Sequence, residues 1–133
     1  MNNQPKVAVL GGGSWATAIV KMLCENLETV GWYMRSIYAT EHIKLNKHNP
    51  NYLSSAELHP NQLILSNNIN KTVENFDILV FAIPSAFLTS ELKKLTISIS
   101  KKVIFSAIKG IVPESGLIAV SYTHLTLPTI LLV

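Results

Sequence analysis

A glycine-rich run near the start of the chain has the residue types and spacing of a phosphate-binding turn. Residues 11–16 read GGGSWA, which matches the pattern G-x-G-x-x-G/A with Gly11, Gly13 and Ala16 in its three small positions. Gly11 would turn the chain sharply out of a strand, and Gly13 would let the backbone approach a pyrophosphate. Ala16 would let the following helix pack closely on that strand. The run therefore predicts a dinucleotide at the N-terminus of a helix.

The residues after the second predicted strand bear on which dinucleotide would bind. An NAD-selective site has Asp or Glu there, which binds the ribose 2′-hydroxyl, but this chain has Met34, Arg35 and Ser36. Arg35 could pair with a 2′-phosphate or lie flat on the adenine, and the alternative is a solvated surface arginine. We therefore expect NADP or NAD as the cofactor, with NADPH preferred or both used. A methyltransferase is disfavoured, because Val9 and Leu10 precede the glycines where an acid is usual.

A second cation follows the fifth predicted strand. Lys109 and Gly110 come directly after an apolar run, and ligands of parallel sheets bind outside the carboxyl ends of the strands. Lys109 would bring a mobile charge to the junction of cofactor and substrate, with a solvated lysine as the alternative. We expect no metal site, because the spacing of the histidines is not that of metal ligands. These are His42, His48, His59 and His124.

The elements that would position these residues alternate between strands and helices. Short apolar runs predict buried strands, and apolar residues at helical spacing follow the first glycines. A short helix is expected between the third and fourth strands, and Ser85 is expected to cap the helix after the fourth. The order predicts an α/β fold, a doubly wound parallel sheet of the Rossmann type. The predicted strands are 6–10, 29–33, 63–66, 77–83 and 102–106, and the predicted helices include 37–46 and a stretch from Ser85 to Leu95.

Bulk properties exclude several classes of function. The 133 residues are 48% hydrophobic and carry a net charge of only +3, without a basic stripe, so nucleic acid is not an expected partner. The single cysteine, Cys24, rules out an internal disulfide and is expected to be a plain helical thiol. No apolar run reaches the length of a membrane helix and the first residues are polar, so we expect a cytoplasmic protein without membrane contact.

Taken together, several motifs resemble NAD(P)-dependent glycerol-3-phosphate dehydrogenase of the bacterial type. They are GGGSWATA at 11–18, Met34-Arg35, NKHNPNYL at 46–53, AIPS at 82–85 and SAIKGI at 106–111, in family order over about residues 5–119. That family reduces dihydroxyacetone phosphate to sn-glycerol 3-phosphate for phospholipid synthesis. The SAIKGI segment speaks against a ketopantoate reductase relative, and a non-catalytic nucleotide-binding module is the remaining alternative.

The resemblance implies a role for several side chains. Ser14 and Trp15 would contact the cofactor at the pyrophosphate turn, Arg35 would contact its adenosine end, and Tyr52 would lie near it. Lys109 would contact both the nicotinamide side and the substrate. The small molecules implied are dihydroxyacetone phosphate and sn-glycerol 3-phosphate, and the parent enzyme is compatible with a homodimer.

The end of the chain departs from the family. Its members are longer, with a helical second domain that carries the catalytic lysine and most of the substrate phosphate site. We therefore expect 1–119 to be an incomplete Rossmann domain, inactive by itself, and no catalytic residue within the chain. Residues 121–133 read SYTHLTLPTILLV, without a charge or a helical period. The segment 120–133 is expected to be an atypical, non-native tail.

Overall fold

The computed structural model describes residues 4–107, 111–112, 117–118 and 131–132. Strands and helices alternate along the chain from β1 to β5, as predicted. The elements in this part are β1 (Val7–Leu10), α1 (Ser14–Leu23), β2 (Val30–Tyr33), α2 (Ile37–Asn46), the 3-10 turn η1 (Pro60–Gln62), β3 (Leu63–Ser66), α3 (Ile69–Asn75), β4 (Ile78–Phe81), α4 (Ser85–Leu92) and β5 (Val103–Ser106). Three two-residue strands follow: β6 (Ile111–Val112), β7 (Leu117–Ile118) and β8 (Leu131–Leu132).

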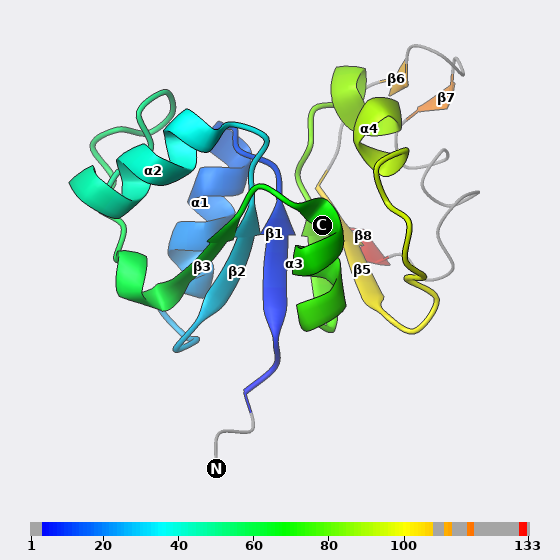
Figure 1. The fold of residues 1–133 in the computed structure, drawn as a ribbon, viewed down its shortest axis with the longest axis horizontal. Coiled ribbons are helices and arrows are strands. Elements are labelled where there is room, and N and C mark those ends of the chain that lie inside the picture. Colours follow the sequence, from blue (N-terminus) through cyan, green and yellow to red (C-terminus); the bar gives the residue numbers. More distant parts are fainter. Residues whose placement is uncertain (1–3, 108–110, 113–116, 119–130, 133) are drawn as a thin grey trace.

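The main sheet is parallel and has the strand order β3-β2-β1-β4-β5-β8 (Figure 1). The order reverses beside β1, because β2 lies on one side of β1 and β4 on the other. In doubly wound folds this reversal opens a crevice at the carboxyl ends of the strands. The predicted fold class is confirmed, and the order is the one that Rossmann domains have.

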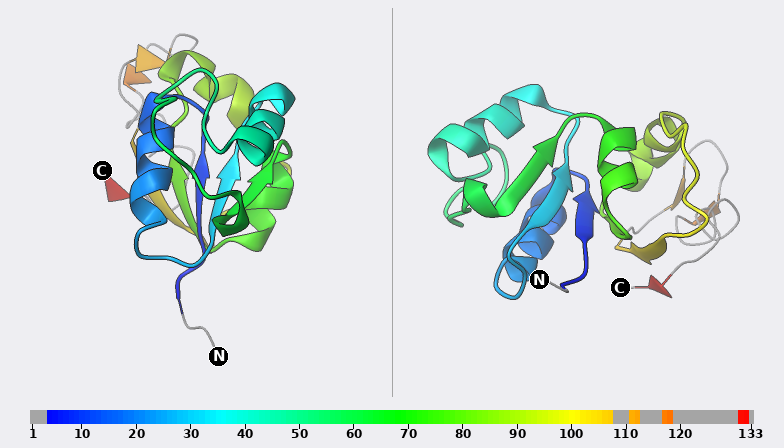
Figure 2. Two further views of the ribbon diagram at one scale, coloured as in Figure 1. Left: turned by 90° about the vertical axis from the view of Figure 1, so that its left-hand side faces the viewer. Right: turned by 60° about the horizontal axis from the view of Figure 1, so that its bottom comes forward.

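Alternate residues of the central strands, such as β1, belong to two separate cores. Ala8 and Leu10 belong to a cluster that includes residues of α3 and α4, whereas Val7 and Val9 belong to one that includes residues of α1 and α2. Successive strand residues point to opposite faces, so a strand buried on both faces reads as a continuous apolar run. Figure 2 shows α1 and α3 on opposite sides of the sheet.

One detail of the sequence prediction is wrong. Ser85 was expected to cap α4, but it is the first residue of that helix, and Pro84 occupies the capping position without a side-chain hydrogen bond. Pro84 has φ −55° and ψ 140°. Its ring fixes φ near this value, and proline has no backbone N–H that would need an acceptor at the start of a helix. The helix ends at Leu92, near the predicted end at about Leu95.

The segment 120–133 lies largely outside the described residues. Its one described part, β8, pairs in parallel with β5 through Phe105–Leu131 and Ser106–Leu132. A domain boundary at residue 119 stays a prediction. In the part of the chain that the structure describes, no helix combines the length and the apolar character that crossing a membrane requires.

Candidate nucleotide-binding site

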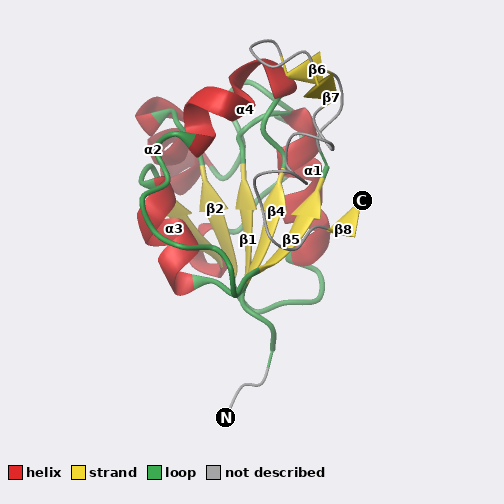
Figure 3. Cartoon of the chain, turned by 90° about the vertical axis from the view of Figure 1, so that its right-hand side faces the viewer, coloured by secondary structure: helices red, strands yellow, loops and turns green. Residues whose placement is uncertain are grey.

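The turn after β1 lies at the reversal of strand order, at the end of the sheet to which the strand arrowheads point (Figure 3). Gly11 has φ +132°, and a Cβ there would lie 2.4 Å from the carbonyl oxygen of Ala82. Its amide donates to the Tyr33 carbonyl (2.9 Å), while the Ala82 amide donates to the Leu10 carbonyl (2.8 Å). Only glycine fits this position, because both the backbone conformation and the contact with the segment after β4 exclude a side chain.

Three side chains bind the three consecutive glycine carbonyls. The buried indole Nε1 of Trp32 donates to the Gly11 oxygen at 2.6 Å. The Nδ2 of Asn49 donates to the Gly12 oxygen at 3.2 Å, and the hydroxyl of Thr17 donates to the Gly13 oxygen at 2.7 Å. Each of the three glycine carbonyls therefore accepts a hydrogen bond from a side chain of the protein. These hydrogen bonds fix the conformation of the turn.

Asn49 itself is fixed on several sides. Its side chain is buried, its Nδ2 also donates to the Thr17 hydroxyl at 3.0 Å, and its Oδ1 accepts from the Asn51 amide at 3.0 Å. The loop after α2 is therefore tied to the glycine turn and to the first turn of α1. A buried amide with satisfied hydrogen bonds makes such a connection specific.

The N-terminus of α1 is open to an anion. Gly13 takes the capping position, and among the described residues no side chain caps this end or places an acid in its first turn. A Cβ on Gly13 would meet nothing within 4 Å. The first helical amides have no intrahelical acceptor and carry the positive end of the helix dipole. A phosphate can therefore approach this backbone closely, which is the chemistry that a pyrophosphate requires.

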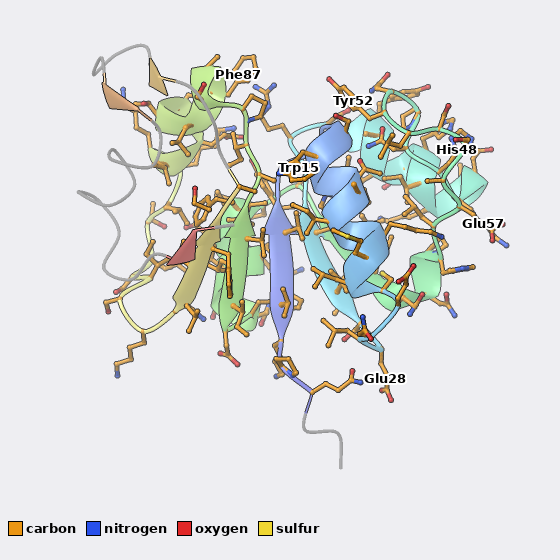
Figure 4. The ribbon with its side chains drawn as sticks, turned by 180° about the vertical axis from the view of Figure 1, so that it is seen from behind. Trp15, Glu28, His48, Tyr52, Glu57 and Phe87 are labelled. Atoms are coloured by element: carbon orange, nitrogen blue, oxygen red, sulfur yellow. The ribbon has the colours of Figure 1, made fainter. Side chains whose placement is uncertain are left out.

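Two adjoining hollows extend from this turn. One, of about 330 Å³, reaches from the glycines over the end of β2 to α4. The other, of about 230 Å³, lies between the start of α1 and the ends of β4 and β5. Tyr52 lines both, and Figure 4 shows Trp15, Tyr52 and Phe87 at the same end of the sheet. A long ligand could lie across the glycine turn with one end in each hollow.

Arg35 lies at the β2 end of the larger hollow. Its guanidinium carbon is 4.5 Å from the centre of the Phe87 ring, and its Nε is 3.8 Å from Oε1 of Glu91. Arg35 is about half exposed, whereas Glu91 is buried. The Glu91 Oε1 also accepts a hydrogen bond from Tyr33 at 3.0 Å, and Lys94 Nζ lies 2.6 Å from its Oε2. An arginine held in this way presents a flat, charged surface to the hollow.

The hydroxyl of Tyr33 is kept protonated by its surroundings. Burial, followed by its hydrogen bond to Glu91 and the charge of that carboxylate, raises the pKa of Tyr33 well above its ordinary value, although Arg35 acts in the opposite direction. Tyr33 is thus a hydrogen-bond donor to a buried anion throughout the physiological range.

The structure brings six of the seven predicted cofactor residues around the two hollows. Gly11 and Gly13 form the turn between them, and the other four line one or both: Ser14, Trp15, Arg35 and Tyr52. Lys109 lies outside the described residues. The cofactor roles of all seven stay predictions.

The structure also describes the surroundings of two histidines and of the single cysteine. His42 and His48 approach each other, with their Nε2 atoms 3.4 Å apart. The described residues contain no group of three or more side chains that could hold a metal ion.

Cys24 is partly buried at the end of α1, and burial raises the pKa of its thiol despite the nearby Lys21.

Sequence reasoning missed four residues of the site. Trp32, Asn49, Phe87 and Glu91 carry no local signal, because each acts through a partner far away in the chain. Trp32 is 21 residues from Gly11, and Asn49 is 37 residues from Gly12. The apolar run at 29–33 predicts only that Trp32 belongs to a strand, and the segment 46–53 that contains Asn49 carries only a family resemblance.

A parallel sheet with this strand order, a glycine turn at its reversal and an uncapped helix N-terminus beside two hollows define a dinucleotide-binding domain of the Rossmann class. The family can also be given. The chain belongs to the family described as NAD-dependent glycerol-3-phosphate dehydrogenase N-terminus, whose model matches residues 6–129.

Curated relatives agree with this family. The chain is 36% identical over 115 residues to "Glycerol-3-phosphate dehydrogenase [NAD(P)+]" of Pseudomonas syringae pv. tomato, a match covering 86% of this chain and 33% of that protein. It is 33% identical over 111 residues to the protein of the same name from Pseudomonas paraeruginosa, covering 84% and 32%. The chain thus spans about a third of the length of these relatives.

Solved structures agree as well. Glycerol-3-phosphate dehydrogenase from Saccharomyces cerevisiae superposes with a TM-score of 0.76 at 28% identity, covering 97% of this chain and 41% of the yeast chain. The enzyme from Coxiella burnetii has a TM-score of 0.78 at 20% identity, covering 97% and 39%, and this likeness bears on the fold alone.

Proposed function

We propose that this chain is the cofactor-binding part of an NAD(P)-dependent glycerol-3-phosphate dehydrogenase, which reduces dihydroxyacetone phosphate to sn-glycerol 3-phosphate. The observation that carries the proposal is the glycine turn, with its carbonyls engaged and the α1 N-terminus open beside the two hollows. The names of the relatives support the reaction and the use of NAD or NADP. The family match favours this function over that of a ketopantoate reductase relative.

Each part of the site has a separate task in this proposal. The amides at the start of α1 bind the pyrophosphate, and Gly13 allows its close approach. Arg35 binds the adenosine end in the larger hollow, while Trp15 and Tyr52 border the smaller hollow, toward which the nicotinamide extends. The bound cofactor supplies the hydride. Lys109, which follows β5 in the sequence, holds the substrate and stabilises the negative charge that develops on its carbonyl oxygen.

Direct titration tests the cofactor assignment. The chain is mixed with NADPH or NADH, and binding is followed by the tryptophan emission, to which Trp15 contributes; this side chain is 53% exposed at the edge of the smaller hollow. Arg35→Ser should weaken NADPH by about 1–3 kcal/mol, the size of a lost charge-assisted contact, and should affect NADH less. Lys71→Ser removes a charge from α3 and serves as the control. Absence of saturable binding to the unaltered chain would refute the proposal.

A further inference from the structure

A buried carboxylate lies beside Arg35, where the predicted site had no acid. Only 1% of the Glu91 side chain is exposed, and the residue lines the same hollow as Arg35. In NAD-selective Rossmann domains, the acid that binds the ribose follows the second strand. Glu91 instead belongs to α4, and it contacts the end of β2 through the Tyr33 hydroxyl. An acid is therefore present at the adenosine end after all, on a different element.

Helix α4 holds Arg35 by two contacts. Phe87 and Glu91 are four residues apart and so share a face of the helix. The guanidinium lies over the Phe87 ring, and its Nε is 3.8 Å from Glu91 Oε1. The Tyr33 hydroxyl of β2 donates a hydrogen bond to the same oxygen. The Glu91 carboxylate therefore lies within ion-pair distance of the Arg35 guanidinium in the hollow.

The carboxylate also sets the charge at this end of the hollow. Arg35, Lys94 and Glu91 form one ion-pair cluster with a net charge of one positive unit. NADPH and NADH differ by the 2′-phosphate, a dianion that a cation attracts and a carboxylate repels, whereas the 2′-hydroxyl of NADH carries no charge. An acid beside Arg35 thus weakens NADPH selectively, and burial reduces the screening of its charge by salt.

We propose that Glu91 is a specificity-determining residue, which keeps NADH in use because its negative charge offsets that of Arg35. This inference rests on the proposed function, because it concerns the same cofactor site. Removal of the carboxylate should shift the preference of the chain toward NADPH.

The test compares dissociation constants of NADPH and NADH for the unaltered chain and for Glu91→Gln. The substitution keeps the shape and an acceptor for Tyr33 while it removes the charge. We expect the ratio of the NADH to the NADPH constant to rise about tenfold, as for a charge close to a partly exposed phosphate. Glu28→Gln, the same change at the opposite end of the molecule (Figure 4), should leave the ratio unchanged.

Lys94→Gln provides a second test on a side chain that is 52% exposed, and it carries the test if Glu91→Gln does not fold. Loss of this cation should move the ratio in the opposite direction, toward NADH. If both cofactors bind and neither variant moves the ratio, or if Glu91→Gln weakens both cofactors equally, the inference is overturned while the proposed function stands. If the unaltered chain binds neither cofactor, both are overturned.

Discussion

At the end of β1, two glycines separated by one residue meet different physical demands. Gly11 has a positive φ and backbone atoms of the segment after β4 where a Cβ would lie, whereas Gly13 has φ −85° and open space. The fold therefore requires glycine at position 11, whereas position 13 requires glycine only when a ligand approaches.

Substitution by alanine should separate these two demands. Gly11→Ala should lower the free energy of unfolding by at least about 2 kcal/mol, through backbone strain and a steric clash. Gly13→Ala should change it by less than about 1 kcal/mol, yet weaken dinucleotide binding, since the new methyl group occupies the approach of the pyrophosphate. Urea unfolding and NADPH titration of both variants provide the measurement. Equal losses of stability would contradict this assignment.

Asn49 connects the loop after α2 to the glycine turn. Replacing Asn49 should therefore weaken cofactor binding, although its side chain is not proposed to contact the cofactor. Asn49→Ala leaves the Gly12 carbonyl and the Thr17 hydroxyl without a donor, which costs about 1–3 kcal/mol of stability. We expect NADPH to bind several-fold more weakly, because the turn is no longer held in one conformation. Asn75→Ala removes a hydrogen bond on the exposed side of α3 and is the control. Unchanged affinity in Asn49→Ala would show that the turn keeps its conformation without the amide.

At the scale of elements, β2 and α4 are joined through Tyr33 and Glu91, and this contact should have a pH dependence. The folded pKa of Tyr33 is raised, so its contribution to stability is complete below the unfolded pKa of about 10. Above that pH the unfolded chain loses the proton first, and stability falls by up to about 1.4 kcal/mol per pH unit. Unfolding in urea between neutral and strongly alkaline pH measures this slope.

Tyr33→Phe should remove this part of the alkaline slope. It should also lower stability at neutral pH by about 1–3 kcal/mol, because a buried carboxylate loses a donor. Tyr38→Phe, on a side chain that is 65% exposed, is the matched control. An identical alkaline slope in the Tyr33 variant and the unaltered chain would mean that Tyr33 does not titrate in this way.

The sequence predicted the elements well because their signals are local. Strands such as β4 lie in short apolar runs that stop before proline or glycine, as residues 77–83 do before Pro84, and Gly11 and Gly13 have the spacing of a phosphate-binding turn. The contacts that fix the site are not local. Glu91 meets Tyr33 across 58 residues, so no spacing rule could reveal that α4 supplies the acid that the end of β2 lacks.

At the scale of the whole molecule, the proposed reaction requires more than a site for the cofactor. The hollows beside the glycine turn can hold a dinucleotide, but a reacting carbonyl must also be fixed against the nicotinamide with a charge-stabilising group at its oxygen. Of the residues proposed for the site, only Lys109 is assigned to the substrate. The relatives are about three times as long as the matched region, which leaves room for further substrate-binding groups.

Residues 1–133 by themselves should therefore bind NADPH weakly, near the millimolar range of a few contacts, without reducing dihydroxyacetone phosphate. Cofactor binding depends on the glycine turn and Arg35, and the chain contains both. Turnover also requires residues that orient the substrate phosphate and supply a proton, and the proposed site assigns no residue to either task. Purified chain is incubated with NADPH and dihydroxyacetone phosphate, and the loss of reduced-nicotinamide absorbance is compared with a sample lacking protein. Turnover above this background that Lys109→Ala abolishes would show that these residues already form a working active site.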